Sequence, residues 1–271
     1  MAFDLSLATY NIFMRPEGII FNDGQRKRLP LMVPRIETLQ ADVLILNEAF
    51  DDGLRRRIVD ALAPTYPHRT DVVGEDRGLR QDGGVLLLSR WPIARERQIR
   101  FDISEGSDRW GDKGCIYAEV ETPAGSLHVF GTHLDSGKNG KNARRKQVEK
   151  IRDFIAGLHV PVDEPVLVGG DLNMGPHHRP DEVAQMKTIL DATLPARTGH
   201  THSYDPLTNI LADGVTKHLD HVLYLNGHDC PTESENEVVQ LKAAEEWDDR
   251  KHKKNKDLSD HYPVVARFSW T

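Results

Sequence analysis

Polar side chains stand at the ends of short apolar segments throughout this chain. An amide, a carboxylate or an imidazole follows four such segments, and a Ser-Asp-His run precedes a fifth: Asn11 after Leu5–Tyr10, Asn47-Glu48 after Val43–Leu46, His133 after Val129–Thr132, Asp171-Leu172-Asn173 after Val166–Gly170, and Ser259-Asp260-His261 before Val264–Phe268. One polar residue at a strand end is usually a cap or a turn residue. Five in one chain predict a shared site, because the strand ends of a layered α/β fold converge on one rim, where ligands bind.

The apolar pattern predicts strands and helices along the whole chain. Pro123-Ala124-Gly125 lies between two alternating segments and predicts a hairpin. Apolar residues recur at helical spacing in Arg26–Leu39 (interrupted by Pro30 and Pro34), Leu54–Leu62, Ala143–Leu158 and Val183–Leu190. Thr232–Lys256 is strongly charged and is expected to be a surface excursion. Since no repeat or linker divides the sequence, we expect one α/β domain over residues 1–271, with helices covering the sheets.

Composition and charge narrow the class of protein. The chain has 35 basic and 42 acidic side chains and a net charge of −7, whereas proteins that bind phosphate backbones usually present a basic face. Nucleic acid is therefore the less favoured partner. Cys115 and Cys230 cannot form a disulfide scaffold and are expected to be free thiols. No apolar run approaches the roughly 20 residues that span a bilayer. The sequence as given has no signal peptide, which fits a cytoplasmic protein or a secreted one whose signal was removed.

The polar residues at these strand ends suit phosphodiester chemistry. Glu48 supplies a hard oxygen ligand and Asn11 a neutral one, and Mg²⁺ needs only one or two protein carboxylates when a phosphate completes its shell. Zinc is disfavoured, because the sequence has no Cys/His cluster with zinc spacing. His133 and His261 can exchange protons near neutral pH, and an aspartate could orient either imidazole. Two histidines, several carboxylates and a divalent metal favour in-line attack of water on a phosphodiester.

The motifs resemble, in order, those of the Mg²⁺-dependent endonuclease/exonuclease/phosphatase superfamily. They are Asn47-Glu48, Thr132-His133, Gly170-Asp171-Leu172-Asn173 and Ser259-Asp260-His261, and the resemblance extends from Asn11 to Phe268. Each motif is weak on its own, whereas their ordered combination is specific. The resemblance implies a four-layer α/β/β/α sandwich, in which two mostly antiparallel mixed sheets are flanked by helices.

The segments between these motifs are similar to the neutral sphingomyelinase C branch of the superfamily. They are Asn47–Asp51, Gln81–Val85, Ser89–Ile93, Lys113-Gly114, His202–Pro206 and Leu219–Val222. The branch implies a Mg²⁺-dependent phosphodiesterase, with Mn²⁺ or Co²⁺ able to replace Mg²⁺, that hydrolyses sphingomyelin to ceramide and phosphocholine. The implied partner is a phospholipid substrate at a membrane surface, and a monomer is the default expectation. The alternatives are an endonuclease or exonuclease acting on DNA and a phosphodiesterase acting on another phosphocholine ester.

The resemblance also carries roles to individual residues. Those implied to hold the metal are Glu48, Asn11 and Asp260. Those implied to be catalytic are His261 as general base, His133 as general acid or phosphate-stabilising residue, Asp171 positioning the attacking water, Asn173 contacting the phosphate, Asp220 orienting a catalytic histidine, and Asp82 as a further acidic residue. Lys113 is implied to be a second substrate-binding residue, as a phosphate contact or a switch.

The resemblance fails in one segment before the final Ser-Asp-His motif. Secreted haemolytic members of the branch carry there an apolar hairpin with an aromatic tip, whereas Ala243–Lys254 holds a single aromatic residue, Trp247, among charged residues. Burying such charges in lipid is costly, so we do not expect this segment to insert into a bilayer. The basic stretch Arg250–Lys256 is either a solvated loop or a contact with anionic headgroups.

Overall fold

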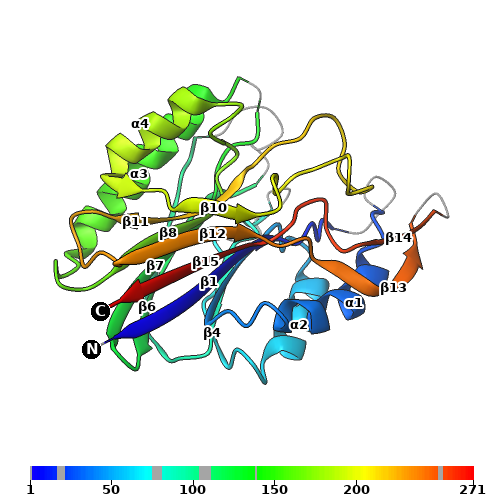
Figure 1. The fold of residues 1–271 in the computed structure, drawn as a ribbon, viewed down its shortest axis with the longest axis horizontal. Helices are drawn as coiled ribbons and strands as arrows, with labels where there is room; N and C mark the ends of the chain where they lie inside the picture. The colour runs from blue at the N-terminus through cyan, green and yellow to red at the C-terminus, as the bar shows by residue number, and fades with distance from the viewer. Residues whose placement is uncertain (1, 17–21, 75–80, 104–110, 138, 250–252) are drawn as a thin grey trace.

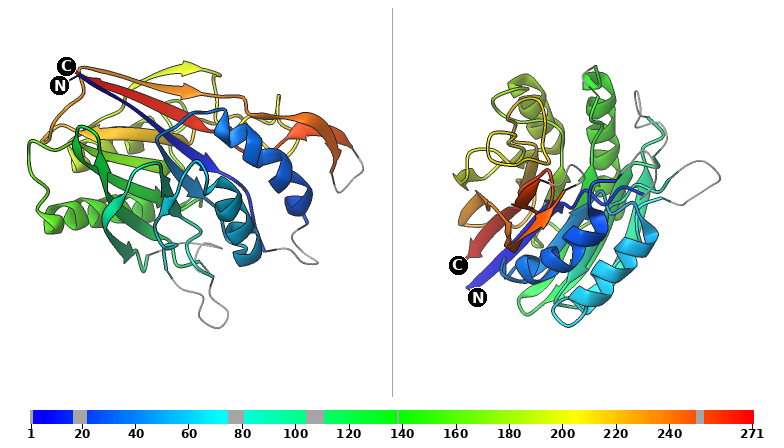
Figure 2. Two further views of the ribbon diagram at one scale, coloured as in Figure 1. Left: turned by 90° about the horizontal axis from the view of Figure 1, so that it is seen from below. Right: turned by 90° about the vertical axis from the view of Figure 1, so that its right-hand side faces the viewer.

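Two β-sheets packed face to face lie at the centre of the computed structural model, and helices cover their outer faces (Figure 1). The structure describes residues 2–16, 22–74, 81–103, 111–137, 139–249 and 253–271. The right-hand view of Figure 2 shows the layers, with one pair of helices on each side of the sheets. The predicted four-layer α/β/β/α sandwich is thus confirmed.

The first sheet is centred on β1 (Phe3–Asn11) and its parallel neighbour β2 (Val43–Asn47). Its seven strands lie in the order β10 (Ala196–Gly199), β12 (Glu233–Val238), β15 (Val264–Trp270), β1, β2, β4 (Leu86–Ser89) and β3 (His68–Arg69). Strands β10 and β12 are also parallel, and the other neighbours are antiparallel.

The second sheet contains the predicted hairpin, which is formed by β6 (Gly114–Thr122) and β7 (Gly125–His133). Its six strands lie in the order β5 (Ile93–Arg100), β6, β7, β8 (Val166–Asp171), β11 (Asp220–Leu225) and β9 (Ala192–Thr193). Only β7 and β8 are parallel among these neighbours. Both sheets are therefore mixed and mostly antiparallel, as expected.

Each sheet has a pair of helices on its outer face. Helices α1 (Gln25–Glu37) and α2 (Asp52–Leu62) cover the first sheet, and α3 (Lys141–Leu158) and α4 (Pro180–Leu190) cover the second. One apolar core lies beneath each pair, and a third core, which includes Leu7, Ile45, Val129 and Phe268, fills the space between the sheets. Among the described residues, no helix is both long and apolar enough to cross a membrane.

Helix α1 runs through the two prolines at which the sequence predicts an interruption. Each proline ring removes one hydrogen bond to the carbonyl group four residues earlier. Pro30 and Pro34 both lie on the exposed face, where water can satisfy those carbonyl groups. The opposite face buries Leu29, Met32 and Ile36, so core packing holds the helix together.

The expectation that Thr232–Lys256 is a surface excursion is wrong for its first part. Glu233–Val238 forms β12, which pairs with β15 inside the first sheet. Glu235 and Glu237 of this strand form ion pairs with Arg267 of β15 at 3.0 and 2.6 Å. The residues between and after them, Asn236 and Val238, are buried. The strand therefore follows the ordinary alternation of exposed and buried residues, but its exposed positions are charged.

The second part of this segment forms a two-stranded hairpin, β13 (Lys242–Asp248) and β14 (Lys254–Asp257). Residues 250–252 of the predicted basic stretch lie outside the described residues. The single aromatic residue points inward: Trp247 is buried in the core beneath α1, and its Nε1 donates to the Asp257 carbonyl oxygen at 2.8 Å. Gly24, with a φ of +69°, permits this packing, because a Cβ there would lie 2.5 Å from the Trp247 ring.

Replacing Trp247 by alanine is expected to lower the free energy of unfolding by about 3–5 kcal/mol, because it empties a core position and removes the hairpin's anchor. Urea denaturation followed by far-UV circular dichroism measures this loss. The neighbouring exposed residue gives a matched control, and Glu246→Ala should change the free energy by no more than about 0.5 kcal/mol. Equal effects of the two substitutions would contradict an inward anchor.

Candidate active site

Strand pairing brings the predicted polar residues to one end of the two sheets. In the first sheet, the parallel pair β1–β2 places Asn11 opposite Asn47. In the second sheet, β7 places His133 opposite Asp171, and β11 places Asp220 opposite Asp171 from the other side. The Asn11 side chain joins the two sheets by donating from Nδ2 to Asp171 Oδ2 at 3.1 Å. The convergence of strand ends expected from the sequence is therefore present in the structure.

A glycine permits the close approach of β7 and β8 at this end. Gly170 has a φ of +145°, and a Cβ there would lie 1.8 Å from the Thr132 carbonyl oxygen. Residues with a side chain are excluded by this contact. The Asn47 amide then fastens the same point, because its Nδ2 donates to Thr132 O at 3.0 Å and its Oδ1 accepts from the Asp171 backbone N–H at 3.2 Å.

His261 and Asp220 form a buried hydrogen-bonded pair at the centre of the site. His261 Nδ1 lies 2.8 Å from Asp220 Oδ2, and His261 Nε2 lies 3.8 Å from Asp171 Oδ2. Burial acts to lower the pKa of His261. The charges of Asp220, Asp171 and Asp260 outweigh burial, so the pKa of His261 lies well above its ordinary value. Because Asp220 holds Nδ1, Nε2 is the nitrogen that can exchange a proton with a reacting group.

His133 lies on the other side of Asp171 and has the opposite protonation preference. Its Nε2 is 3.5 Å from Asp171 Oδ2. Burial and the nearby Lys113 ammonium lower the pKa of His133 to about 3, so its imidazole is neutral at pH 7. Lys113 is itself buried and donates from Nζ to the Leu134 carbonyl oxygen at 2.8 Å. A neutral His133 can donate a hydrogen bond to an anion, but it is a poor source of a proton.

Three carboxylates, those of Glu48, Asp260 and Asp171, lie beside these histidines. Burial and the charge of Asp260 raise the pKa of Glu48 to about 7, and a hydrogen bond with Asn11 opposes the rise. Burial, with a smaller effect of Asp171, also raises the pKa of Asp260. Glu48 has a φ of +54°, a backbone conformation that is rare for residues other than glycine and common at functional sites. Crowded carboxylates with a neutral amide fit a divalent cation such as Mg²⁺, whose charge offsets their repulsion.

Asp171 also belongs to a second set of possible metal ligands, with Asp220 and His261. One atom from each of Asp171, Asp220 and His261 lies within 4.8 Å of the other two. Asp220 Oδ1 is buried and has no hydrogen-bond partner within the described part of the chain. The hydrogen bond between Asp220 Oδ2 and His261 Nδ1 nevertheless suits a proton-transfer pair better than a metal site. Glu48 and Asp260 therefore stay the predicted ligands of a cation, with Asp171, Asp220 and His261 as a second possible set.

Asn173 fixes the orientation of Asp171. Its backbone N–H donates to Asp171 Oδ1 at 3.0 Å, while Asn11 donates to Oδ2, so both carboxylate oxygens are held. Asn173 has a φ of +51°, and its Nδ2 donates to Leu134 O at 3.0 Å. The same Leu134 carbonyl accepts from Lys113. Lys113 and Asn173, the two residues expected to contact the substrate phosphate, thus donate to the same backbone oxygen.

Asp82 is bound by the backbone of its own loop and by an arginine of α2, beside the Glu48 segment. Its Oδ1 accepts from the Gly84 backbone N–H at 2.8 Å, and its Oδ2 lies 2.8 Å from Arg55 Nη1 on α2. Arg55 also donates to the carbonyl oxygen of Ala49, the residue after Glu48, at 2.6 Å. These contacts make Asp82 and Arg55 positioning residues for the strained backbone at Glu48, and a catalytic role for Asp82 stays a prediction.

Replacing Arg55 by methionine is expected to lower the free energy of unfolding by about 3 kcal/mol, because it removes a largely buried ion pair with Asp82. The double substitution Arg55→Met/Asp82→Asn should recover part of this loss, since it also removes the carboxylate. Chemical denaturation of both variants measures the effect, and Arg56→Met, on the exposed face of the same helix, is the matched control. Additive losses in the double variant would show that the two side chains act independently.

Three positioning residues were not assigned a role from the sequence. Ser259 and Tyr204 lie within motifs that carry the resemblance, whereas no sequence signal identifies Arg28. Arg28, fully buried in α1, donates to the carbonyl oxygens of Ile12, Phe13 and Leu258 and so ties the segment after β1 to the segment before Asp260. Ser259 donates from Oγ to the Asn11 carbonyl oxygen at 2.5 Å. The Tyr204 ring meets the His261 imidazole edge-on, with centroids 5.2 Å apart.

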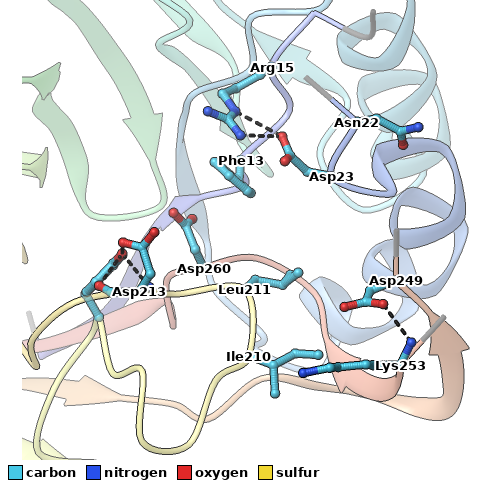
Figure 3. Close-up of a pocket in the computed structure, with 11 residues that line it drawn as sticks. Phe13, Arg15, Asn22, Asp23, Ile210, Leu211, Asp213, Asp249, Lys253 and Asp260 are labelled. Carbon is cyan, nitrogen blue, oxygen red and sulfur yellow. Dashed lines mark hydrogen bonds and ion pairs between the residues drawn. The ribbon is translucent and has the colours of Figure 1, made fainter. Parts of the chain in front are cut away.

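A cavity of about 480 Å³ opens at Asp260. We call Glu48 and Asp260 the acidic group. The other residues that line the cavity come from the segment after β1, the loop before β11 and the β13–β14 hairpin: Phe13, Arg15, Asn22, Asp23, Tyr204, Ile210, Leu211, Asp213, Asp249 and Lys253. Figure 3 shows Asp260 near Phe13 and Asp213, with Ile210 toward Lys253 of the hairpin. A substrate group could therefore reach the carboxylates from this side.

Comparisons with known proteins show a similarity to one enzyme family along nearly the whole chain. The model of the endonuclease/exonuclease/phosphatase family matches residues 8–261. A sphingomyelinase C of Bacillus cereus is 33% identical over 98% of this chain and 89% of its own length. A phospholipase C of Staphylococcus aureus is 31% identical over 97% of this chain and 87% of its own length.

Solved structures agree with these relatives. Sphingomyelinase C from Streptomyces griseocarneus is 33% identical and superposes with a TM-score of 0.90 over 98% of this chain and 99% of its own. A beta toxin variant from Staphylococcus aureus with bound magnesium ions is 31% identical, with a TM-score of 0.91 over 97% of this chain and 99% of its own. The chain therefore belongs to the endonuclease/exonuclease/phosphatase family and, within it, to the sphingomyelinase C branch.

Proposed function

We propose that this chain is a Mg²⁺-dependent phosphodiesterase that hydrolyses sphingomyelin to ceramide and phosphocholine. The observation that carries the proposal is the buried His261–Asp220 pair, which directs Nε2 toward Asp171 beside the acidic group of Glu48 and Asp260. Relatives named sphingomyelinase C support the choice of lipid substrate. Since the site draws on residues from Asn11 to His261, we also propose that residues 1–271 act as one catalytic domain.

The side chains divide the work of hydrolysis between them. In its deprotonated form, His261 takes a proton at Nε2 from the attacking water, which Asp171 positions, and Asp220 stabilises the imidazolium that forms. The new bond joins the water oxygen to phosphorus, and the bond from phosphorus to the ceramide oxygen breaks. That oxygen takes a proton from solvent water and leaves as the hydroxyl group of ceramide, and the proton held by His261 returns to solvent. The low pKa of His133 favours the phosphate-stabilising role of the two expected for it, together with Lys113 and Asn173.

Mg²⁺ would be held by Glu48, Asp260 and the oxygen of Asn11, where it would neutralise charge on the phosphate. The acidic group offers oxygen ligands, so Mn²⁺ or Co²⁺ should support turnover in its place. The lipid would be taken at a membrane surface by a monomer. A relative named beta toxin favours the secreted of the two locations that the sequence allows.

Release of phosphocholine from sphingomyelin in detergent micelles tests this function. Release is expected with Mg²⁺, and EDTA should abolish it. Supercoiled plasmid DNA in the same buffer is the comparison substrate. Nicking of the plasmid without release of phosphocholine would replace the lipid with nucleic acid, the alternative that the net charge of −7 disfavours.

A further inference from the structure

The loop between β10 and β11 displays apolar side chains to solvent. Of the four large apolar side chains that are exposed in the described part of the chain, three lie within nine residues of this loop: Leu207 at 85% exposed, Ile210 at 50% and Val215 at 66%. We name Pro206–Val215 the apolar loop. Single exposed apolar residues are ordinary. A cluster of them on a surface indicates an interaction site.

Inward hydrogen bonds hold the apolar loop in place. Asn209 donates from Nδ2 to the Ser259 carbonyl oxygen at 2.8 Å, and the Ile210 backbone N–H donates to Asp257 Oδ2 at 2.9 Å. At the start of the loop, Asp205 accepts from the Leu207 backbone N–H and from the Thr208 hydroxyl, both at 3.0 Å. The buried Asn209 and the backbone of the loop are thus bonded to the protein, while Leu207, Ile210 and Val215 are left exposed to solvent.

The apolar loop is continuous with the candidate active site. Ile210 and Leu211 line the cavity that opens at Asp260, and they face it together with Lys253 of the hairpin (Figure 3). Tyr204, just before the loop, contacts His261, and its hydroxyl donates to the Asp213 carbonyl oxygen at 3.0 Å. A molecule that touches the apolar loop is therefore at the entrance to the catalytic groups.

We propose that the apolar loop docks this protein onto the interfacial region of a choline-phospholipid membrane and presents the cavity to the lipid headgroups; the inference rests on the proposed sphingomyelin substrate. Residues 206–212, Pro-Leu-Thr-Asn-Ile-Leu-Ala, carry no charge, so immersing them desolvates no ion, and Asp213 is the single charged residue of the loop. The β13–β14 hairpin cannot supply the same anchor, because its single aromatic residue, Trp247, is buried. Since the loop is already held, little conformational entropy is lost on docking.

Vesicle binding without turnover tests the docking surface. The probe is a vesicle of sphingomyelin and phosphatidylcholine, and binding is measured by flotation in EDTA. The variant Leu207→Asn/Val215→Asn changes two side chains that lie outside the cavity lining. We expect its partition coefficient to fall roughly tenfold or more, because membrane affinity scales with the apolar area that enters the interface. Its unfolding temperature and its kcat/KM on a water-soluble phosphocholine diester should match those of the wild type.

The fourth exposed apolar side chain provides the matched control. Val162 is 74% exposed and precedes β8, whereas Asp171 ends that strand, so Val162 lies at the opposite end of the sheet from the site. Val162→Asn should bind vesicles as the wild type does. Wild-type binding by the double variant, or an equal loss in Val162→Asn, would overturn the proposal. Failure of the wild type to hydrolyse any phosphocholine diester would instead refute the proposed function, which the flotation measurement does not require.

Discussion

Replacing His261 by alanine is expected to lower kcat for phosphocholine release by about three orders of magnitude. A positioned general base contributes roughly 10²–10⁴-fold, and His261 is the histidine whose Nε2 is directed at Asp171 by a buried carboxylate. Steady-state kinetics on micellar sphingomyelin measure the loss. His228→Ala is the matched control, because His228 follows the opposite end of β11 from Asp220 and contacts the Pro161 carbonyl oxygen. A loss of less than tenfold in His261→Ala would remove His261 from the role of base.

The pH dependence separates a base from a residue that merely supports the fold. A base must be deprotonated, so activity rises with pH through the pKa of His261. Asp220 is the largest of the three carboxylate effects that raise this pKa. In Asp220→Asn the pKa falls, and the acid limb of the kcat/KM profile should therefore move to lower pH. The maximum rate should still fall by roughly 10²–10⁴-fold, because the amide stabilises the imidazolium poorly. An acid limb that stays in place would show that another group controls it.

Much of the fold could be predicted from the sequence because the core residues recur at the usual spacings of strands and helices. Strands β1, β2, β8 and β15 are apolar runs, and α3 presents Val148, Ile151 and Ile155 at helical spacing. Strand β12 could not be found in this way, because its exposed positions are glutamates that pair with Arg267 of a strand about thirty residues away. The partner of a strand depends on the order of strands in the sheet, and the local sequence does not reveal that order.

The site was predictable where chemistry and strand ends coincide. Asn11, His133 and Asp171 each end a strand, and Asp220, assigned from the resemblance, begins one; register brings His133, Asp171 and Asp220 together, and the packing of the two sheets adds Asn11. Residues that act through the backbone left no such signal. Arg28 looks like any helix arginine in sequence, yet it binds carbonyl groups on both sides of the site.

Asp82 and the hairpin mark the limits of reading roles from a resemblance. A motif shows that a carboxylate is present but not whether it faces a substrate or an arginine. Asp82 forms an ion pair with Arg55 of α2. The charges of the hairpin argue against insertion into a bilayer, and that expectation stays a prediction. The hairpin sequence could not show that Trp247 is buried, since that depends on Gly24 of a distant segment.

Replacing Glu48 by glutamine is expected to weaken Mg²⁺ binding by about a hundredfold and to lower kcat at moderate Mg²⁺ by roughly three orders of magnitude. The substitution keeps the size of the side chain and removes its charge. It also removes a buried carboxylate whose pKa is raised to about 7 by burial and, less strongly, by repulsion from Asp260, so the apo variant should be no less stable than the apo wild type. Isothermal titration of the metal-free protein with Mg²⁺ measures the affinity independently of activity.

The same titration decides between the two possible metal positions. If the cation lies at Glu48 and Asp260, Glu48→Gln loses affinity, while Asp220→Asn, which belongs only to the second set of ligand atoms, keeps it. If the cation lies instead among Asp171, Asp220 and His261, the two results exchange, and His261 can no longer serve as a free base. Glu245→Gln, an exposed residue of the hairpin, controls for the loss of one negative charge. Wild-type affinity in Glu48→Gln would therefore refute both the metal site and the acid–base assignment built beside it.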